Sequence, residues 1–284
     1  MPAISLSSFI RNMGLALVCT TATAAFADST ISEQLDKALD GDHRSAENKA
    51  RDQYRHPHQT LTFFGLEPDM RVLEITPGGG WYTEVLAPVL QERGELIAAS
   101  FGADHPVDYL ARVHGRYMDK LDADPDTYGA VERILFQEDG RYLPALADES
   151  VDMVVTFRNT HNWIKQGEAE AIYQAMHRVL KPCGTLGVVQ HRAADDADVR
   201  ASAKQGYVPE PYMVDMLEGI GFELVARSDI NANPKDDRDH PEGVWTLPPS
   251  YRLGDTDRDK YEAIGESDRM TLKLRKPGAQ CPAS

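Results

Sequence analysis

The sequence predicts a doubly wound α/β fold, in which helices cover both faces of a mostly parallel sheet. From Met70 onward, short apolar runs alternate with segments of helical pattern, and parallel strands need such long return connections. Three adjacent glycines follow the first apolar run, where a sharp strand-to-helix turn is expected. The chain of 284 residues is 42% hydrophobic and 26% charged, which suits one large core with elaborations.

The elements of this fold follow in order along the chain. Residues 28–54 are polar and helix-favouring, with Ser32 as the expected cap and Leu35 and Leu39 on one face, which predicts two short helices over the body. Strands are expected near 70–75, 95–101, 131–136, 151–156, 184–190, 222–230 and 269–275. Helices are expected near 80–92, 106–121 and 167–180 and after Pro211. The irregular stretch 231–265 is where a substrate-covering loop is sought.

Charge and hydropathy exclude two classes of protein. The formal net charge is −15, so the surface field repels phosphate backbones, and nucleic acid is not expected as a partner. The long apolar stretch lies within the first 27 residues, which excludes a multi-span membrane protein.

The N-terminal segment has the pattern of a secretory signal peptide. A single charge, Arg11, precedes an apolar run, and small residues lead to Ala27, which predicts cleavage between Ala27 and Asp28 and export to the periplasm or medium. A membrane anchor is the alternative, but the run is short and rich in Thr. Lipidation at Cys19 is a second alternative, although Val18 occupies the position before the cysteine, where lipidated proteins normally have a small residue. The predicted organisation is a signal peptide (1–27), a helical cover (28–58) and one α/β domain (59–284).

The glycine turn lies in the segment VLEITPGGGWYTE, residues 72–84. A turn of this kind presents backbone N–H groups at a helix N-terminus, which suits a carboxylate or phosphate. Two later segments follow it in order: LPALADESVDMVV at 143–155 and HRVLKPCGTLGVV at 177–189.

In this order the three segments resemble the motifs of the class I S-adenosylmethionine-dependent methyltransferases, particularly the small-molecule branch, over about residues 61–277. More narrowly, RHPHQTLTFFGL, FRNTHNW and GESDRM are similar to segments of exported bacterial proteins described as predicted methyltransferases. The resemblance implies a Rossmann-like methyltransferase sheet of seven strands with an antiparallel last strand. It also implies S-adenosyl-L-methionine as the cofactor.

The resemblance assigns the methionine end of the cofactor site. Glu74 matches the acid that closes the first strand, and Gly78 and Gly80 match the second and third glycines of the family motif, whereas Thr76 replaces the first. The expected cofactor-binding residues of this turn are Glu74, Thr76, Pro77, Gly78, Gly79 and Gly80.

Two further positions concern the nucleoside. Asp139 matches the aspartate that accepts a hydrogen bond from the adenine amino group, and a carboxylate suits that group because the amine is only a donor. The family places an acid at the end of the second strand for both ribose hydroxyls, but here Ser100 stands there, with Asp104 nearby. Loss of one charge-assisted bidentate contact costs roughly 2–3 kcal/mol, so weaker or altered cofactor binding is expected.

The polar segment FRNTHNW, residues 157–163, follows the fourth predicted strand, at the sheet edge where open α/β folds bind ligands. Five functional side chains stand within six positions, which is too polar a segment for a core: Arg158, Asn159, His161, Asn162 and Trp163. One interpretation makes His161 a general base or orienting group and Arg158 or Asn159 a substrate clamp. The other is a hydrogen-bonded loop lid without a chemical role.

Histidines raise the question of a metal site. None of them has helical i,i+4 ligand spacing or a paired cysteine, so no metal site is predicted. The histidines considered are His56, His58, His161, His191 and His240.

Removal of the signal peptide leaves two cysteines, Cys183 and Cys281. The fold implied by the resemblance inserts the last strand antiparallel beside the fifth, so the end of one meets the start of the other. We therefore predict a Cys183–Cys281 disulfide, which an oxidising compartment preserves.

Together these features predict an exported enzyme that transfers a methyl group from S-adenosyl-L-methionine to a small-molecule substrate. No membrane span is expected in the mature form, and no pattern indicates an oligomeric state. The alternative is an exported binding protein that uses the same pocket for a nucleoside-like or anionic ligand without catalysis. Thr76 and Ser100 favour this alternative, whereas Glu74, Asp139 and the glycines favour the enzyme. A metal-assisted hydrolase is a third possibility.

Overall fold

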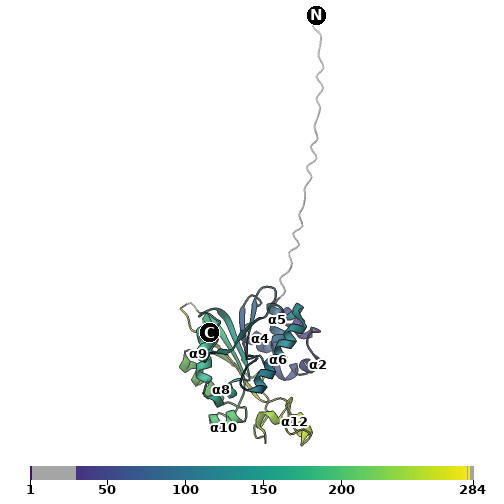
Figure 1. Cartoon of the computed structure of the whole chain (residues 1–284), viewed down its shortest axis with the longest axis vertical. Helices are drawn as coiled ribbons and strands as arrows, with labels where there is room; N and C mark the ends of the chain where they lie inside the picture. The colour runs from purple at the N-terminus through teal and green to yellow at the C-terminus, as the bar shows by residue number, and fades with distance from the viewer. Residues whose placement is uncertain (2–29, 280, 282–284) are drawn as a thin grey trace.

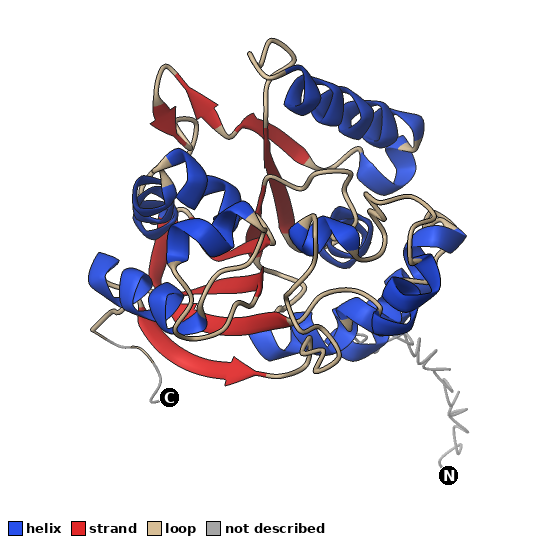
Figure 2. Ribbon diagram, turned by 90° about the horizontal axis from the view of Figure 1, so that it is seen from below, coloured by secondary structure: helices blue, strands red, loops and turns tan. Residues whose placement is uncertain are grey.

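A seven-stranded sheet runs through the middle of the domain, with helices on both of its faces (Figure 1 and Figure 2). The computed structural model describes residues 30–279 together with Met1 and Cys281. The strands lie in the order β3-β2-β1-β6-β7-β9-β8. Their bounds are β1 Arg71–Ile75, β2 Glu95–Ser100, β3 Glu132–Leu135, β6 Val151–Phe157, β7 Leu180–His191, β8 Glu223–Ser228 and β9 Arg269–Arg275.

The pairing of the strands confirms the predicted topology. β1 pairs in parallel with β2 and β6, and β7 continues the parallel set, whereas β9 lies antiparallel between β7 and β8. From β1 the chain runs to β2 and β3 on one side and then crosses to β6 on the other. The carboxyl ends of β1 and β6 therefore form a switch point, which is where open α/β sheets bind ligands.

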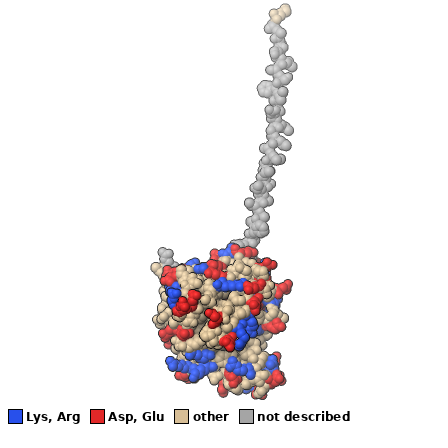
Figure 3. Space-filling view, viewed as in Figure 1, with Lys and Arg blue, Asp and Glu red and all other residues tan. Residues whose placement is uncertain are grey.

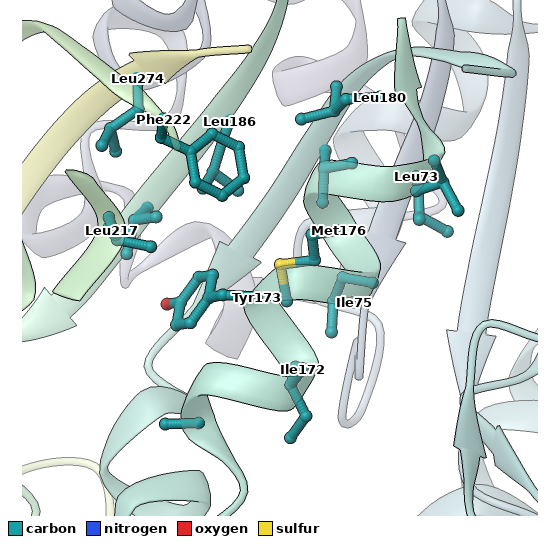
Figure 4. Close-up of a cluster of buried hydrophobic side chains, with 14 of the residues drawn as sticks. Leu73, Ile75, Ile172, Tyr173, Met176, Leu180, Leu186, Leu217, Phe222 and Leu274 are labelled. Atoms are coloured by element: carbon teal, nitrogen blue, oxygen red, sulfur yellow. The ribbon is translucent and has the colours of Figure 1, made fainter. Parts of the chain in front are cut away.

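Alternating side chains of the strands build a core on each face of the sheet. The helices involved are α4 Pro57–Phe64, α5 Thr83–Leu90, α6 Asp108–Ala123, α9 Ala169–Val179 and α11 Glu210–Ile220. Val72 belongs to the core shared with α4, α5 and α6, and its neighbour Leu73 belongs to the core shared with α9 and α11. Figure 4 shows the second core, in which Ile75 lies close to Met176.

The N-terminal segment folds as helices α1 Ile31–Asp40, α2 Ala46–Lys49 and α3 Asp52–Arg55. Thr30, rather than the expected Ser32, caps α1 through a capping box with Glu33. α1 packs against α5, and the indole of Trp81 donates a hydrogen bond to the carbonyl oxygen of Asn48 at 3.1 Å. These helices are thereby fixed to the residues that follow the glycine turn.

The predicted disulfide is confirmed. Cys183 and Cys281 are joined across 98 positions of sequence, with their Cα atoms 5.2 Å apart. Cys183 has φ +66°, a left-handed conformation, at the position where the family motif has a glycine. The backbone N–H of Cys183 donates to the carbonyl oxygen of Lys276, so the tail after β9 lies beside the start of β7.

The structure corrects the interpretation of residues 157–163 as too polar for a core. Residues from Thr160 form helix α8, Thr160–Gln166, and His161 and Trp163 are only 4% and 3% exposed. Trp163 packs beside Phe136 and edge-on to Tyr173. Thr160 is buried as well, whereas Lys165 and Gln166 are exposed, so the start of this helix is packed into the domain and its end faces solvent.

Several short elements lie outside the predicted ones. They are α7 Pro125–Tyr128, the hairpin strands β4 Gln137–Glu138 and β5 Arg141–Tyr142, α10 Val199–Lys204, the 3₁₀ helix η1 Gly243–Thr246 and α12 Arg258–Ile264. The stretch 231–265, expected to be irregular, thus contains η1 and α12.

Acidic and basic side chains are interspersed over the face of the molecule seen in Figure 3. Among the described residues, no helix combines the length and apolar character that crossing a bilayer requires. Residues 2–27 of the predicted signal peptide lie outside the described residues.

Candidate functional site

The glycine turn connects β1 to α5 and presents open space at two positions. A Cβ added to Gly78 or Gly79 meets no atom within 4 Å, and Gly78 has φ +64°. A Cβ at Gly80 would lie 2.8 Å from the ring of Tyr117, so this glycine is required for packing. The N–H of Gly80 donates to the carbonyl oxygen of Pro77 at 3.0 Å, which closes the turn.

A cavity of about 390 Å³ adjoins this turn at the carboxyl edge of the sheet. Thr76 and Gly78 line it on one side, and Phe101 and Phe136, which follow β2 and β3, line another. Trp163 of α8 contributes a further aromatic ring. The wall therefore combines aromatic rings with polar side chains, which include Gln137, Asn159 and Lys165.

Glu74 lies beneath the glycine turn and does not belong to the cavity wall. It is 2% exposed and accepts a hydrogen bond from the hydroxyl of Thr83 at 2.6 Å. Burial raises the pKa of the Glu74 carboxyl to about 7, although the Thr83 hydrogen bond and the charge of Lys120 oppose that shift. The carboxyl thus holds the first turn of α5 and titrates near neutral pH.

Asn159 lines the cavity, whereas Ser100 does not. The amide of Asn159 donates to the carbonyl oxygen of Ile75 at 3.2 Å, which links the loop after β6 to the end of β1. Ser100 is buried, and its hydroxyl lies 3.2 Å from Nδ1 of His114. The neighbour of Ser100, Phe101, reaches the cavity instead.

Asp139 is placed away from the cavity. It is exposed and occupies the tip of the β4–β5 hairpin, where Asp139 and Gly140 have φ +49° and +74°. Gln137 and Tyr142, at the base of this hairpin, belong to the cavity wall. The sequence spacing of the family motif is preserved, but the hairpin moves the aspartate outward. Gln137 has a carbonyl oxygen that can accept from an amino group.

His161 lies behind the cavity wall. Its Nδ1 is 3.3 Å from the amide nitrogen of Gln190, and its ring packs near those of His191 and Trp245. Burial, with smaller effects from the charges of Lys165 and Arg158, lowers the pKa of His161 to about 3. The imidazole is therefore uncharged at neutral pH.

The histidines considered for a metal site are not brought together as one ligand set. Among the described residues, Asp236, Asp237 and His240 place ligand atoms within 4.8 Å of one another. Both carboxylate oxygens of Asp236 accept hydrogen bonds from the hydroxyl of Tyr207, and one also accepts from the backbone N–H of Asp268. This group joins the loop 231–243 to the sheet.

Comparison with known proteins identifies a methyltransferase domain. Residues 73–188 match the family model described as a methyltransferase domain, and these residues run from β1 through the glycine turn into β7. These findings support a class I S-adenosylmethionine-dependent methyltransferase. A curated relative of this methyltransferase is sterol 24-C-methyltransferase erg6 of Schizosaccharomyces pombe, 25% identical over 207 residues, which are 68% of this chain and 49% of the relative. The methyltransferase thus spans about half the length of that relative.

Solved structures share the fold of this methyltransferase. A SAM-dependent methyltransferase from Aquifex aeolicus is 16% identical with a TM-score of 0.54, over 86% of this chain and 98% of its own. The [4+2]-cyclase SpnF is 15% identical with a TM-score of 0.55, over 87% and 93%. The N-methyltransferase NodS from Bradyrhizobium japonicum WM9, in complex with S-adenosyl-l-homocysteine, is 14% identical with a TM-score of 0.50, over 88% and 100%.

The cavity of this methyltransferase fits the family's cofactor. Its volume of about 390 Å³ is in the usual range for small-ligand pockets, and its aromatic wall suits a purine ring. Thr76 lines the cavity and keeps a buried hydroxyl without a hydrogen-bond partner, which a bound ligand can satisfy. Gly78 leaves room for the ligand beside the turn. Thr76, Gly78, Gln137 and Asn159 are the residues that would hold the cofactor.

Proposed function

We propose that the protein transfers a methyl group from S-adenosyl-L-methionine to a small-molecule acceptor after export. The observation that carries the proposal is the cavity beside the glycine turn, where Gly78 and Gly79 face open space. The match of residues 73–188 to the methyltransferase domain supports the reaction class. The net charge of −15 favours a small acceptor over nucleic acid.

The residues of the site position the reactants in this proposal. S-adenosylmethionine supplies an electrophilic methyl group on its sulfonium sulfur, and transfer mainly requires the acceptor nucleophile to lie in line with it. Asn159 fixes the loop after β6 to the end of β1. In the proposal this contact keeps the acceptor-binding loop at a constant position relative to the glycine turn. His161 is uncharged and orients this loop through Gln190 rather than storing a proton.

The proposal is tested by calorimetric titration of S-adenosyl-l-homocysteine into protein that begins at Asp28. We expect saturable one-to-one binding. Absence of binding at millimolar ligand would overturn the assignment of the cavity.

Export is supported by the pattern of residues 1–27 and by the disulfide between Cys183 and Cys281, since such bonds persist in oxidising compartments. N-terminal sequencing of the protein from its own compartment is expected to start at Asp28. Recovery of residues 1–27 intact, or of a lipidated Cys19, contradicts this expectation.

A second candidate is a non-catalytic exported binding protein. Ser100, in place of an acid that would bind the ribose, and Thr76, in place of a glycine, favour it. The fold does not fix the reaction, because a [4+2]-cyclase shares it. Mass spectrometry of ligands retained on purification separates the candidates: S-adenosylmethionine or S-adenosylhomocysteine favours the enzyme, and another nucleoside-like or anionic ligand favours the binding protein.

A further inference from the structure

Four arginines that are distant in sequence gather beside the glycine turn. Arg51 and Arg55 come from the segment around α3, Arg158 follows β6, and Arg269 begins β9. We call these four residues the arginine cluster. Three of them share one carboxylate, Glu266, and Arg158 faces the same group of charges.

Glu266 is 2% exposed and is saturated by the arginines around it. Its Oε1 accepts from Nε of Arg51 at 2.5 Å, and its Oε2 accepts from Arg269 and lies 3.5 Å from Nε of Arg55. These neighbouring positive charges hold the pKa of Glu266 far below its usual value despite burial, so it stays ionised. One ionised carboxylate therefore balances several guanidinium groups.

The cluster retains donor capacity that the described residues do not use. Arg55 and Arg269 are 4% and 2% exposed, yet Nη1 of Arg55 and Nε of Arg269 have no hydrogen-bond partner. Within the described residues, no carboxylate lies at ion-pair distance from Arg158. Buried polar groups are nearly always hydrogen-bonded in folded proteins, so unused charged donors indicate a missing acceptor.

The pKa shifts of the arginines also indicate that the cluster lacks an anion. Burial and the positive charge of Arg269 lower the pKa of Arg158 to about 9, and burial together with Arg158 lowers that of Arg55 well below its usual value. The chain as a whole carries a net charge of −15, so a local concentration of positive charge is not a consequence of the overall composition. A second anion among the guanidinium groups would offset their repulsion.

The cluster adjoins the proposed reaction site. Arg158 directly precedes Asn159, which lines the cavity. The guanidinium of Arg55 lies 4.5 Å from the ring of Trp81, which directly follows the glycine turn. Arg158 also has φ +63°, a conformation that non-glycine residues rarely adopt and that recurs at functional sites.

We propose that the arginine cluster binds an oxyanion, a carboxylate or a phosphate, carried by the methyl acceptor. The proposal rests on the proposed methyl transfer and names the acceptor as an anionic small molecule. Guanidinium groups present paired N–H donors whose geometry matches both oxyanions. Arg158 is half-buried and Arg51 keeps 21% of its side chain exposed, so an anion can reach the cluster from solvent.

The test titrates inorganic phosphate and, separately, malonate into the full mature chain by calorimetry at constant ionic strength, with chloride as the balancing anion. At least one of the two is expected to bind, and the one that binds tells phosphate from carboxylate acceptors. Arg158→Gln should weaken that binding at least tenfold, and Arg158→Lys should weaken it less. Arg200→Gln, an exposed arginine of α10, is the matched control and should leave it within twofold.

Two outcomes overturn the proposal: neither anion binds, or Arg158→Gln binds the anion as tightly as the unmutated protein. Titration with S-adenosyl-l-homocysteine tests the proposed function separately, and Arg158→Gln should leave that affinity within twofold. A protein that binds S-adenosyl-l-homocysteine but no anion loses only the arginine proposal. A protein that binds the anion alone loses the methyl-transfer proposal and keeps the anion site.

Thermal unfolding distinguishes a binding arginine from a structural one. Removing Arg158 relieves like-charge repulsion, so Arg158→Gln should leave the Tm unchanged or higher without anion. Phosphate or malonate should raise the Tm of the unmutated protein by binding the folded state, and this rise should be lost in the variant. A lower Tm for Arg158→Gln with an undiminished anion-induced rise contradicts the proposal.

Discussion

The cavity and the arginine cluster meet in the loop after β6, where Asn159 belongs to one and Arg158 to the other, but their chemistry differs. Gly78 and Asn159 line the cavity, whose wall combines aromatic rings with mostly uncharged polar side chains. Arg158, one residue before Asn159, belongs to a group of buried charges balanced by the single carboxylate Glu266. One region therefore suits a ligand recognised by shape and stacking, and the other suits a ligand recognised by charge.

This difference separates what the family supplies from what this chain adds. The cavity is made by the strand ends of the shared fold, so it belongs with the common cofactor. The cluster needs Arg51 and Arg55 from the N-terminal segment and Arg269 from the far end of the domain, both outside the residues 73–188 that match the family model. In our proposal the cluster therefore binds the acceptor rather than the cofactor.

Gly78→Val should have the largest effect and should separate the two regions most clearly. The side chain fills the open space beside the turn, so we expect at least a hundredfold loss of affinity for S-adenosyl-l-homocysteine in calorimetry, with phosphate or malonate affinity within twofold. Gly254→Val is the control, because Gly254 has the same φ of +64° and open surroundings but is exposed outside the cavity. Equal losses of cofactor affinity in both variants would show backbone strain rather than occupation of the cavity.

Removal of the disulfide should weaken the fold without distinguishing the two regions. The bond lies at the start of β7, at the opposite edge of the sheet from the carboxyl strand ends. Cys183→Ser with Cys281→Ser should lower the free energy of unfolding by about 2–4 kcal/mol in urea titrations. The reduced unmutated protein is the control and should match the double variant. Altered affinity for S-adenosyl-l-homocysteine in the folded double variant would contradict this separation.

Glu74→Gln should remove part of the pH dependence of the free energy of unfolding, because Glu74 lies beneath the glycine turn. The pKa of Glu74 is raised to about 7 from an ordinary value of 4.5, so folding favours the protonated form. The stability that this group contributes is fully present below pH 4.5 and is lost as the pH rises through 7. Urea titrations at pH 5 and pH 8 should show that the variant lacks this component, roughly 1–3 kcal/mol. Identical pH dependence in the two proteins contradicts the assignment.

The smallest effect compares two residues of one hairpin. Asp139→Ala should change the affinity for S-adenosyl-l-homocysteine less than twofold, because Asp139 is exposed at the tip. Gln137→Ala should weaken it threefold to tenfold, because Gln137 lines the cavity. A larger loss of affinity in Asp139→Ala than in Gln137→Ala would indicate that Asp139 contacts the adenine, as the family motif implies.

Prediction from the sequence worked best for the features that periodicity or the family resemblance fixes, and worked less well for the positions of individual functional side chains. The strand ends, the glycine turn and the Cys183–Cys281 pair followed from periodicity and the resemblance. The burial of His161 and the exposed position of Asp139 could not be predicted from the sequence, because helix α8 and the β4–β5 hairpin decide where those side chains point. The segment GESDRM contains Glu266 and Arg269, but nothing local indicated that they would meet Arg55.

The sequence by itself determined the architecture, because alternating apolar runs, a glycine-rich turn and crossover-length helices allow few arrangements other than a doubly wound sheet. Only the tertiary structure decided which residues form the arginine cluster. Arg55 and Glu266 are 211 positions apart, and their contact exists because β9 inserts beside β7 while the N-terminal helices fold over α5. Electrostatic interactions depend on distance in space, and sequence patterns report only distance along the chain.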